Sequence, residues 1–248
     1  IVRKITRYFT MTIKTNEGEV EFHIDQESDT GIDPELKIET KKDMKKIQET
    51  KKEKEAVIDP LWLDKKSFRF TLMAIFAALV VVLGYLLVYI PNIQLVFVML
   101  FLTGFIMGKK DGAAIGLMGS FLFCFFNPLG ASPLPLLAFQ IVYYSCIAIM
   151  GASIHSLLKN KEYFKPKEDL YVLKVLILFG SLGGLLTFLY DVLTTVIHAL
   201  VFFGTLKAFW PTYLIGITFT TVHLISNILI FVFVLPALIQ TCYKMLDL

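Results

Sequence analysis

The feature that most constrains this chain is the scarcity of charge after Arg69. Residues 70–248 hold nine lysines, six acidic residues and no arginine among 179 positions. About a quarter of the residues of a soluble domain are charged, and a nucleic-acid-binding domain needs a basic face. Both classes are therefore excluded. The sequence predicts an integral membrane protein.

The apolar residues are grouped into runs of the length that crosses a hydrocarbon core about 30 Å thick. Turn-forming or charged residues separate the runs, among them Pro91 and Lys109–Asp111. We predict an all-α polytopic membrane domain of six transmembrane helices over residues 65–248. The second and third helices are short, and a tilted or partly re-entrant arrangement is open for them. The six predicted helices cover 70–90, 93–108, 112–126, 133–158, 171–203 and 211–245.

Basic residues are distributed unevenly between the loops on the two sides of these helices. Three precede the first helix, two lie at Lys109-Lys110, and four lie within 159–169. The loops on the other side contain one lysine, Lys207, and cover 90–93, 127–132 and 204–210. Cytoplasmic loops carry the excess of Lys and Arg. Both the N and the C terminus are therefore predicted to be cytoplasmic.

Residues 1–64 differ from the rest of the chain in composition. Residues 1–69 hold 15 of the 24 Lys and Arg and 15 of the 21 acidic residues, so this part carries no net charge. Within it, residues 41–55 have only Met44 and Ile47 as apolar side chains. Segments of such composition rarely form a packed core, so we predict a charged cytoplasmic N-terminal extension that is largely disordered. Alternation in Gly18–Ile24 indicates one short strand. The ten residues before Met11 are either an upstream extension or an addition to the natural chain.

Polar side chains occur at helical spacing inside three of the predicted helices. They fall at i, i+4, i+7 and i+11 on the fifth helix and at i, i+3 and i+7 on the sixth, so each set occupies one face. Polar groups within a membrane usually face a cavity or the interior of a bundle. We predict a cavity that opens to the outside and is walled by the fourth, fifth and sixth helices. The stripes comprise Gln140, Tyr144, Thr187, Asp191, Thr194, His198, Thr220, His223 and Asn227.

Asp191 is the one acidic residue predicted to lie deep in the bilayer. At a rise of about 1.5 Å per residue, it lies about 25 Å from Lys174 at the inner interface. Two interpretations are open. In the first, Asp191 is structural, either paired with His198 or His223 or protonated and hydrogen-bonded to a threonine. In the second, it binds a donor or a cation on a ligand.

Motifs of hydrolytic and metal enzymes are absent from the sequence. No Gly-rich loop precedes a Lys-Ser/Thr pair, and neither G-x-S-x-G nor H-E-x-x-H occurs. The chain is therefore not expected to hydrolyse ATP itself, and no metal site or cofactor is expected. Cys124, Cys146 and Cys242 lie in apolar runs, where free cysteines act as small buried hydrophobic residues.

Six local motifs follow one another along the membrane domain. They are Ala74-x-x-x-Ala78, YIPNIQ at 89–94, GKKDGAAIG at 108–116, NPLGASPLP at 127–135, FLYDVLTT at 188–195 and HLISN at 223–227. In this order they resemble the substrate-binding (S) component of energy-coupling factor (ECF) transporters, six-helix membrane proteins that capture vitamins and related micronutrients. The resemblance covers about residues 70–245 and leaves the N-terminal extension outside it.

The resemblance implies a multi-pass protein of a prokaryotic plasma membrane that binds a vitamin-sized molecule from outside and is not an enzyme. Ala74 and Ala78 would dock on the transmembrane (T) component, which is bound to two ATPase subunits that drive uptake. Loops at Asn92 and Asn127–Ser132 would gate the cavity. The implied substrate contacts are Asn127, Gln140, Tyr144, Asp191, Thr194, His198, His223 and Asn227.

A second interpretation is a structural role. A non-transport membrane scaffold of the MreD-like type has a comparable small multi-helix layout and binds protein partners instead of solutes. In that case the polar stripes are internal hydrogen bonds, and the charged extension is the element that binds the partner. Neither interpretation expects a nucleic acid as a partner.

Overall fold

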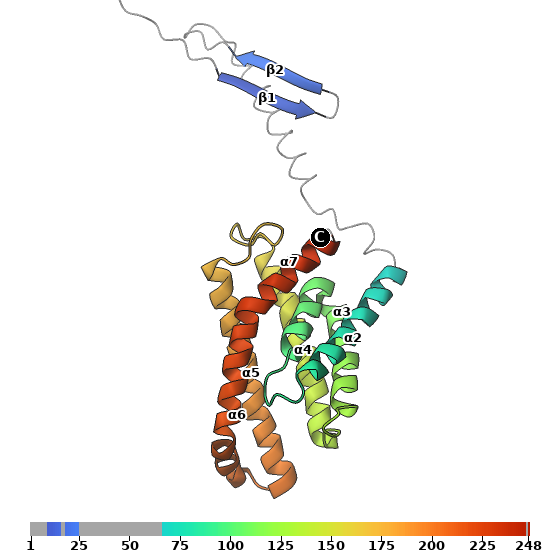
Figure 1. The fold of residues 1–248 in the computed structure, drawn as a ribbon, viewed down its shortest axis with the longest axis vertical. Coiled ribbons are helices and arrows are strands. Elements are labelled where there is room, and N and C mark those ends of the chain that lie inside the picture. The colour runs from blue at the N-terminus through green and yellow to red at the C-terminus, as the bar shows by residue number, and fades with distance from the viewer. Residues whose placement is uncertain (1–8, 16–17, 25–65, 247) are drawn as a thin grey trace, which may run out of the picture. The chain divides into compact units, whose positions relative to one another are not determined.

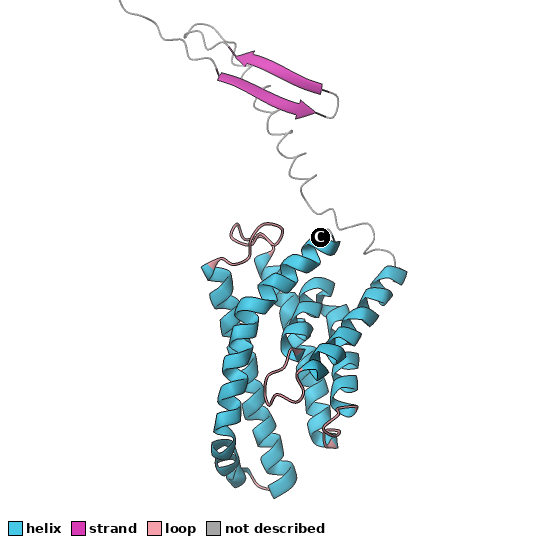
Figure 2. Cartoon of the chain, in the orientation of Figure 1, coloured by secondary structure: helices cyan, strands magenta, loops and turns pink. Residues whose placement is uncertain are grey.

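The computed structural model describes residues 9–15, 18–24, 66–246 and 248 of the chain (Figure 1). Contacts divide the chain into two units, Ile1–Ile58 and Asp59–Leu248. In the first unit, β1 (Phe9–Thr15) pairs antiparallel with β2 (Gly18–Ile24) (Figure 2). The strand predicted at Gly18–Ile24 is therefore confirmed. The remainder of the predicted N-terminal extension lies outside the described residues.

Helices make up the second unit, joined by short loops. Four helical stretches are long and apolar enough to cross a membrane, namely Lys66–Leu86, Leu134–Leu158, Leu173–Phe203 and Leu206–Leu246. Large apolar side chains are exposed on their outer surfaces, including Val82, Val142 and Ile215, as contact with lipid requires. The helices are α2 (Lys66–Leu86), α3 (Val96–Phe125), α4 (Leu134–Leu158), α5 (Leu173–Phe203), α6 (Phe209–Leu229) and α7 (Leu235–Leu246).

The predicted break between the second and third runs lies inside α3, at Gly108. Gly108 has φ +83° and ψ −179°, a backbone conformation open mainly to glycine. A Cβ atom on Gly112 would lie 2.6 Å from the Cα atom of Gly104, although eight residues of continuous helix span about 12 Å. The chain therefore reverses at Gly108, and α3 consists of two helical segments packed against each other.

The first segment of α3 is buried on all sides. Every residue from Val96 to Phe105 is buried. Its backbone meets that of α4, because a Cβ atom on Gly104 would collide with the carbonyl group of Ala148, and one on Gly151 with the carbonyl group of Phe101. Small residues that let two backbones approach are typical of helix association in membranes. Gly104, Gly112 and Gly116, which recur at four-residue spacing with Gly108, pack inside the bundle, while Gly108 forms the turn.

The last helix is interrupted by a π-helical turn between α6 and α7, at Ile230–Val234 (η2). Pro236 lies two residues after the turn, and a proline has no N–H group and crowds the carbonyl group four residues before it. A π turn accommodates such a fault within an otherwise continuous helix. The hydroxyl group of Tyr171 donates to the carbonyl oxygen of Phe233 at 2.8 Å, so one carbonyl of the turn gains a partner from the loop after α4.

The first predicted helix ends earlier than expected, at Leu86 rather than at residue 90. Two turns follow, in which the N–H groups of Val88 and Ile90 donate to the carbonyl groups of Tyr85 and Leu87. The cause is the Pro91-Asn92 sequence, since proline disfavours a helix before it and Asn92 adopts a positive φ of 59°. Residues 87–95 therefore form a loop.

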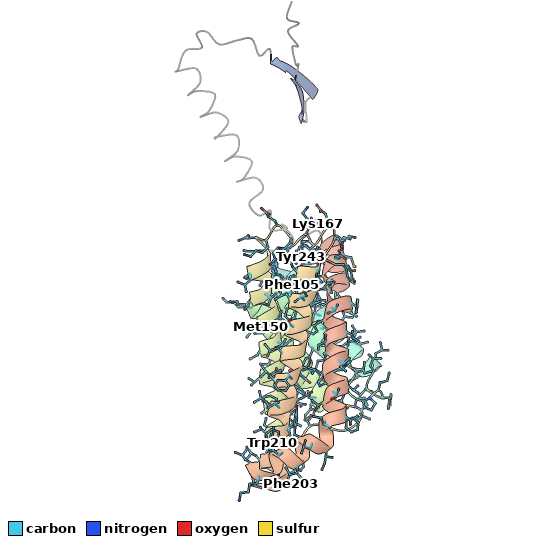
Figure 3. All side chains as sticks on the ribbon, turned by 90° about the vertical axis from the view of Figure 1, so that its left-hand side faces the viewer. Phe105, Met150, Lys167, Phe203, Trp210 and Tyr243 are labelled. Atoms are coloured by element: carbon cyan, nitrogen blue, oxygen red, sulfur yellow. The ribbon has the colours of Figure 1, made fainter. Side chains whose placement is uncertain are left out.

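The two ends of the bundle differ in the residues that they carry. The start of α2, the loop after α4 and the end of α7 lie at one end (Figure 1). Lys167 and Tyr243 mark this end, and Phe203 and Trp210 mark the opposite one (Figure 3). Of the cysteines, Cys124 is buried, but Cys146 is exposed on the outer face of α4, so the prediction of burial is wrong for that thiol.

The close packing of α3 on α4 predicts that one added methyl group destabilises the protein at Gly104 but not at an open position of another helix. Gly104→Ala forces a side chain into the Ala148 carbonyl group, and overpacking of this kind costs about 1–3 kcal/mol. Thermal unfolding of the purified protein in detergent should show a lower Tm than wild type. Gly216→Ala is the matched control, because a Cβ atom there meets nothing within 4 Å. Equal Tm values for the two variants would contradict this account of the α3–α4 contact.

Candidate functional site

A cavity of about 360 Å³ lies where the loop after α2 and the loop after α3 meet the inner faces of α4, α5 and α6. Six of the eight predicted substrate contacts line it, namely Asn127, Gln140, Tyr144, Asp191, Thr194 and His223. The volume is at the lower end of the range of small-molecule sites, about 300–1,000 Å³. The loop that follows α2 bounds the cavity, and α2 starts at the end of the bundle that Lys167 marks. The cavity therefore lies toward the opposite end.

A chain of hydrogen bonds crosses the cavity from the 87–95 loop to α5. The Nε2 atom of Gln94 lies 3.1 Å from Nε2 of His223, and Nδ1 of His223 lies 2.8 Å from Oδ1 of Asp191. An amide nitrogen only donates, so Nε2 of His223 accepts and Nδ1 carries the proton that Asp191 accepts. One carboxylate oxygen of Asp191 is thus bonded to the imidazole ring. The other, Oδ2, is buried without a partner among the described residues.

A second polar cluster lies beside the first and joins α4 to α5. The side-chain amide of Gln140 donates to the hydroxyl group of Tyr190 at 2.9 Å, and the hydroxyl group of Tyr144 donates to the same oxygen at 3.2 Å. The rings of Tyr144 and Tyr190 stack with centroids 5.6 Å apart. Phe97, from the buried segment of α3, contacts the ring of Tyr190 edge-on, with centroids 5.2 Å apart. Packing and hydrogen bonds together fix this wall of the cavity.

His198 and Asn227 do not line the cavity. His198 lies two turns beyond Asp191 on α5, with its ring against Phe202 and Phe203. Asn227 lies one turn beyond His223 and is fully buried. Both atoms of its side-chain amide lack a hydrogen-bond partner among the described residues. These two predicted contacts therefore lie at a different depth along the bundle from the cavity.

The threonines of the fifth-helix stripe bond to their own helix. Thr187 donates to the carbonyl oxygen of Gly183 at 2.7 Å, and Thr194 donates to that of Tyr190 at 2.8 Å. This back-bonding satisfies a hydroxyl group without a partner from another helix. Thr194 nevertheless lines the cavity, whereas Asp191 depends on His223 from α6 for its bond.

Three residues of the site were absent from the sequence prediction, namely Gln94, Phe97 and Tyr190. Gln94 and Phe97 lie at the start of the apolar run of α3, where no polar periodicity marks them. Tyr190 is adjacent in sequence to Asp191, yet both line the cavity. The usable signal was the amide of Gln94 directly before the uninterrupted apolar run 95–102, because a polar group within an apolar segment needs a partner.

The 87–95 loop is held against α6 by its own backbone as well as by Gln94. The hydroxyl group of Ser226 donates to the carbonyl oxygen of Asn92 at 3.0 Å. Asn92 and Gln94 therefore both bond to α6, and their partners Ser226 and His223 lie within one turn of that helix. The loop forms a wall of the cavity, and its displacement would open that wall.

The predicted docking residues lie on the outer face of α2. Ala74 and Ala78 are exposed, whereas the neighbouring Ala77 is buried against the bundle. Exposed apolar residues flank them, including Ile75 and Leu79. Among the described residues, no group of three or more His, Cys, Asp or Glu side chains is arranged to hold a metal ion.

The unpartnered amide of Asn227 predicts that its removal stabilises the protein. A buried polar group without a hydrogen bond costs about 1–3 kcal/mol, and leucine has a similar volume. Asn227→Leu should raise the Tm in detergent. Asn127→Leu is the matched control and should lower the Tm, because Oδ1 of Asn127 accepts the N–H group of Leu129 at 2.9 Å. A lower Tm for Asn227→Leu would show that the amide has a partner that the structure lacks.

The contact between Ser226 and the loop predicts faster hydrogen exchange when the hydroxyl group is removed. A single hydrogen bond contributes about 0.5–1.5 kcal/mol, so Ser226→Ala should raise the exchange rate of amides in 87–95 by roughly two- to tenfold. Mass spectrometry of peptic fragments measures it. Thr221→Ala is the control, because its hydroxyl group donates to Ile217 within α6. Equal exchange in both variants would show that the hydroxyl group does not hold the loop.

Comparisons with protein-family models, with characterised proteins and with solved structures gave no match for this chain. Its function is therefore argued from the cavity and from the surface of α2. The cavity contributes a carboxylate, an imidazole ring, amides and tyrosines. The outer face of α2 contributes a stripe of small exposed side chains among larger apolar ones.

Proposed function

We propose that this protein is the membrane-embedded substrate-binding subunit of an ECF-type transporter, which captures a vitamin-like small molecule from outside the cell. A separate T component and two ATPases would then drive its uptake. The observation that carries the proposal is the cavity, whose wall holds a carboxylate with one unbonded oxygen. Buried polar groups without partners in a concave site are typical of ligand binding.

Orientation follows from the distribution of basic residues. We place the end marked by Lys167 at the cytoplasm of a prokaryotic cell, together with both termini. The positive-inside rule supports this placement, since the loops of the opposite end contain one lysine. The cavity then faces outward. The proposal counts six spans, with the two segments of α3 as the second and third.

The loops around the cavity supply its entrance in this proposal. The 87–95 loop and the loop that begins at Asn127 both contribute residues to its wall. Two hydrogen bonds to α6 hold the first loop, and water or a ligand could replace the partner in each of them. A solute would enter when this loop moves away from α6, and the loop would close over it.

Binding, rather than chemical conversion, fits the groups in the cavity. Asp191 is the one acidic side chain among the described residues that line it. General acid–base chemistry on a solute usually needs a second acid or base, or a nucleophile beside a base. The neighbouring His223 is already bonded on both ring nitrogens. We therefore propose a binding subunit that is not an enzyme.

Docking on the T component would use the outer face of α2. Ala74 and Ala78 are one helical turn apart and exposed, and small residues at this spacing let a partner helix approach closely. The large side chains of Ile75 and Leu79 beside them would add apolar contact. Packing of the bundle itself does not require small residues at these two exposed positions.

The experiment that tests the proposal is co-purification of the tagged chain with a T component and its two ATPases. We expect a stoichiometric complex that survives size-exclusion chromatography. Ala74→Trp combined with Ala78→Trp should abolish it, because two indole rings would block the approach of a partner helix. The readout is the ratio of the four subunits in the eluted peak.

The matched control is Ile215→Trp combined with Phe219→Trp. These positions are also one turn apart and exposed, but they lie on α6. The complex should survive this double substitution. A protein that is folded and monodisperse yet never binds the T component would favour the scaffold interpretation, in which the chain binds other proteins.

A further inference from the structure

We infer that the ligand of this cavity is a small organic cation whose N–H group donates to the Oδ2 atom of Asp191. The inference rests on the proposed function, because it names the chemical class of the solute. It follows from the protonation pattern of the Gln94–His223–Asp191 chain, from the burial of the unbonded oxygen and from the charge of the cavity wall.

The hydrogen-bond chain makes the imidazole ring neutral. The amide nitrogen of Gln94 has no lone pair to offer, so it donates to Nε2 of His223. The ring then carries its proton on Nδ1 and donates to Oδ1 of Asp191 at 2.8 Å. A neutral imidazole ring leaves the negative charge of the carboxylate uncompensated. With Asp191 ionised, the described residues that line the cavity carry one uncompensated negative charge.

In the described part of the chain, no basic side chain of the cavity wall neutralises that charge. The described residues that line the cavity include neither lysine nor arginine. Oδ2 of Asp191 is buried and accepts no hydrogen bond from any described residue. An unpaired charge in a medium of low dielectric constant is costly. A ligand with a protonated amine removes this cost by a charge-assisted hydrogen bond, which is among the strongest that a site makes.

The surroundings of the carboxylate also favour a cation. The ring of Tyr190 lines the cavity next to Asp191, and Tyr144 stacks on it. Aromatic faces attract cations. The same wall disfavours an anionic ligand, since a carboxylate or phosphate group would meet Asp191 without a basic residue. At about 30 Å³ for each water molecule in the liquid, the cavity holds the volume of roughly a dozen waters, which limits the ligand to a small molecule.

Matched pairs of probes that differ in one group test the inference. Tryptamine and tryptophol share the same ring and the same number of non-hydrogen atoms, but one carries an ammonium group and the other a hydroxyl group. Phenethylamine and phenethyl alcohol form a smaller pair. Titration calorimetry of the full chain in detergent should show at least tenfold tighter binding of the amine in one or both pairs. Tryptophan, which adds a carboxylate group to tryptamine, should bind more weakly than tryptamine.

Variants then assign the preference to Asp191. Asp191→Asn should remove the difference between amine and alcohol, and Asp191→Glu should retain part of it. Asp169→Asn is the matched control, because it makes the same change at an exposed carboxylate outside the cavity, and it should behave as wild type. If Asp191→Asn does not fold, the comparison of amine with alcohol on the wild-type protein still decides.

Several outcomes would overturn the inference. Equal affinity for amine and alcohol would mean that the Asp191–His223 pair carries no net negative charge. Tighter binding of the alcohols or of tryptophan, or no binding of either amine, would exclude a cation as the ligand. These failures leave the transporter proposal standing if the complex with the T component survives. Loss of that complex, with the preference for amines intact, would instead overturn the transporter role and keep the cation site.

Discussion

The close approach of α3 and α4 is the contact on which the rest of this bundle depends. Gly104 and Gly151 lie each against a carbonyl group of the opposite helix, so the two backbones meet without side chains between them. Contact of this kind gains dispersion energy and weak Cα–H···O interactions, which matter where lipid offers apolar side chains an equal environment. It also fixes Phe97 and Phe101 in the centre of the bundle, and Phe97 in turn supports the ring of Tyr190.

The cavity combines features that would each be unfavourable alone. A carboxylate within an apolar bundle is costly, and the bond from His223 satisfies only one of its two oxygens. The tyrosine cluster beside it bonds internally, which leaves the rings rigid and their polar atoms mostly satisfied. The site is therefore preorganised except at two oxygen atoms, Oδ2 of Asp191 and Oε1 of Gln140, and these two acceptors define the polarity of what fits. Rigid walls with few unsatisfied groups favour selectivity, since a ligand gains most by supplying the missing partners.

Helix positions were predictable from the sequence because each apolar run ends at residues that physically stop a membrane helix, such as Pro91 and Lys109–Asp111. Helical periodicity also placed Asp191 and His223 on inward faces. Depth was harder to predict, because His198 lies about 10 Å further along α5 than Asp191 and the cavity ends before it. Gln94 was missed since its partner is on α6, far away in sequence. The reversal at Gly108 brings such residues together, and periodicity within one helix carries no information about it.

The reversal at Gly108 has a consequence for biogenesis. The segment between Val96 and Gly108 is shorter than the roughly 17–25 residues of a helix that inserts into a bilayer by itself, and its buried residues face protein on all sides. An insertion machinery that selects spans by length and hydropathy would admit α2, α4, α5 and the α6–α7 stretch individually. The α3 hairpin has no such independent route, so it must partition together with its neighbours. Assembly of this membrane protein would therefore be ordered in time, and the centre of the bundle, with the wall of its cavity, would form last.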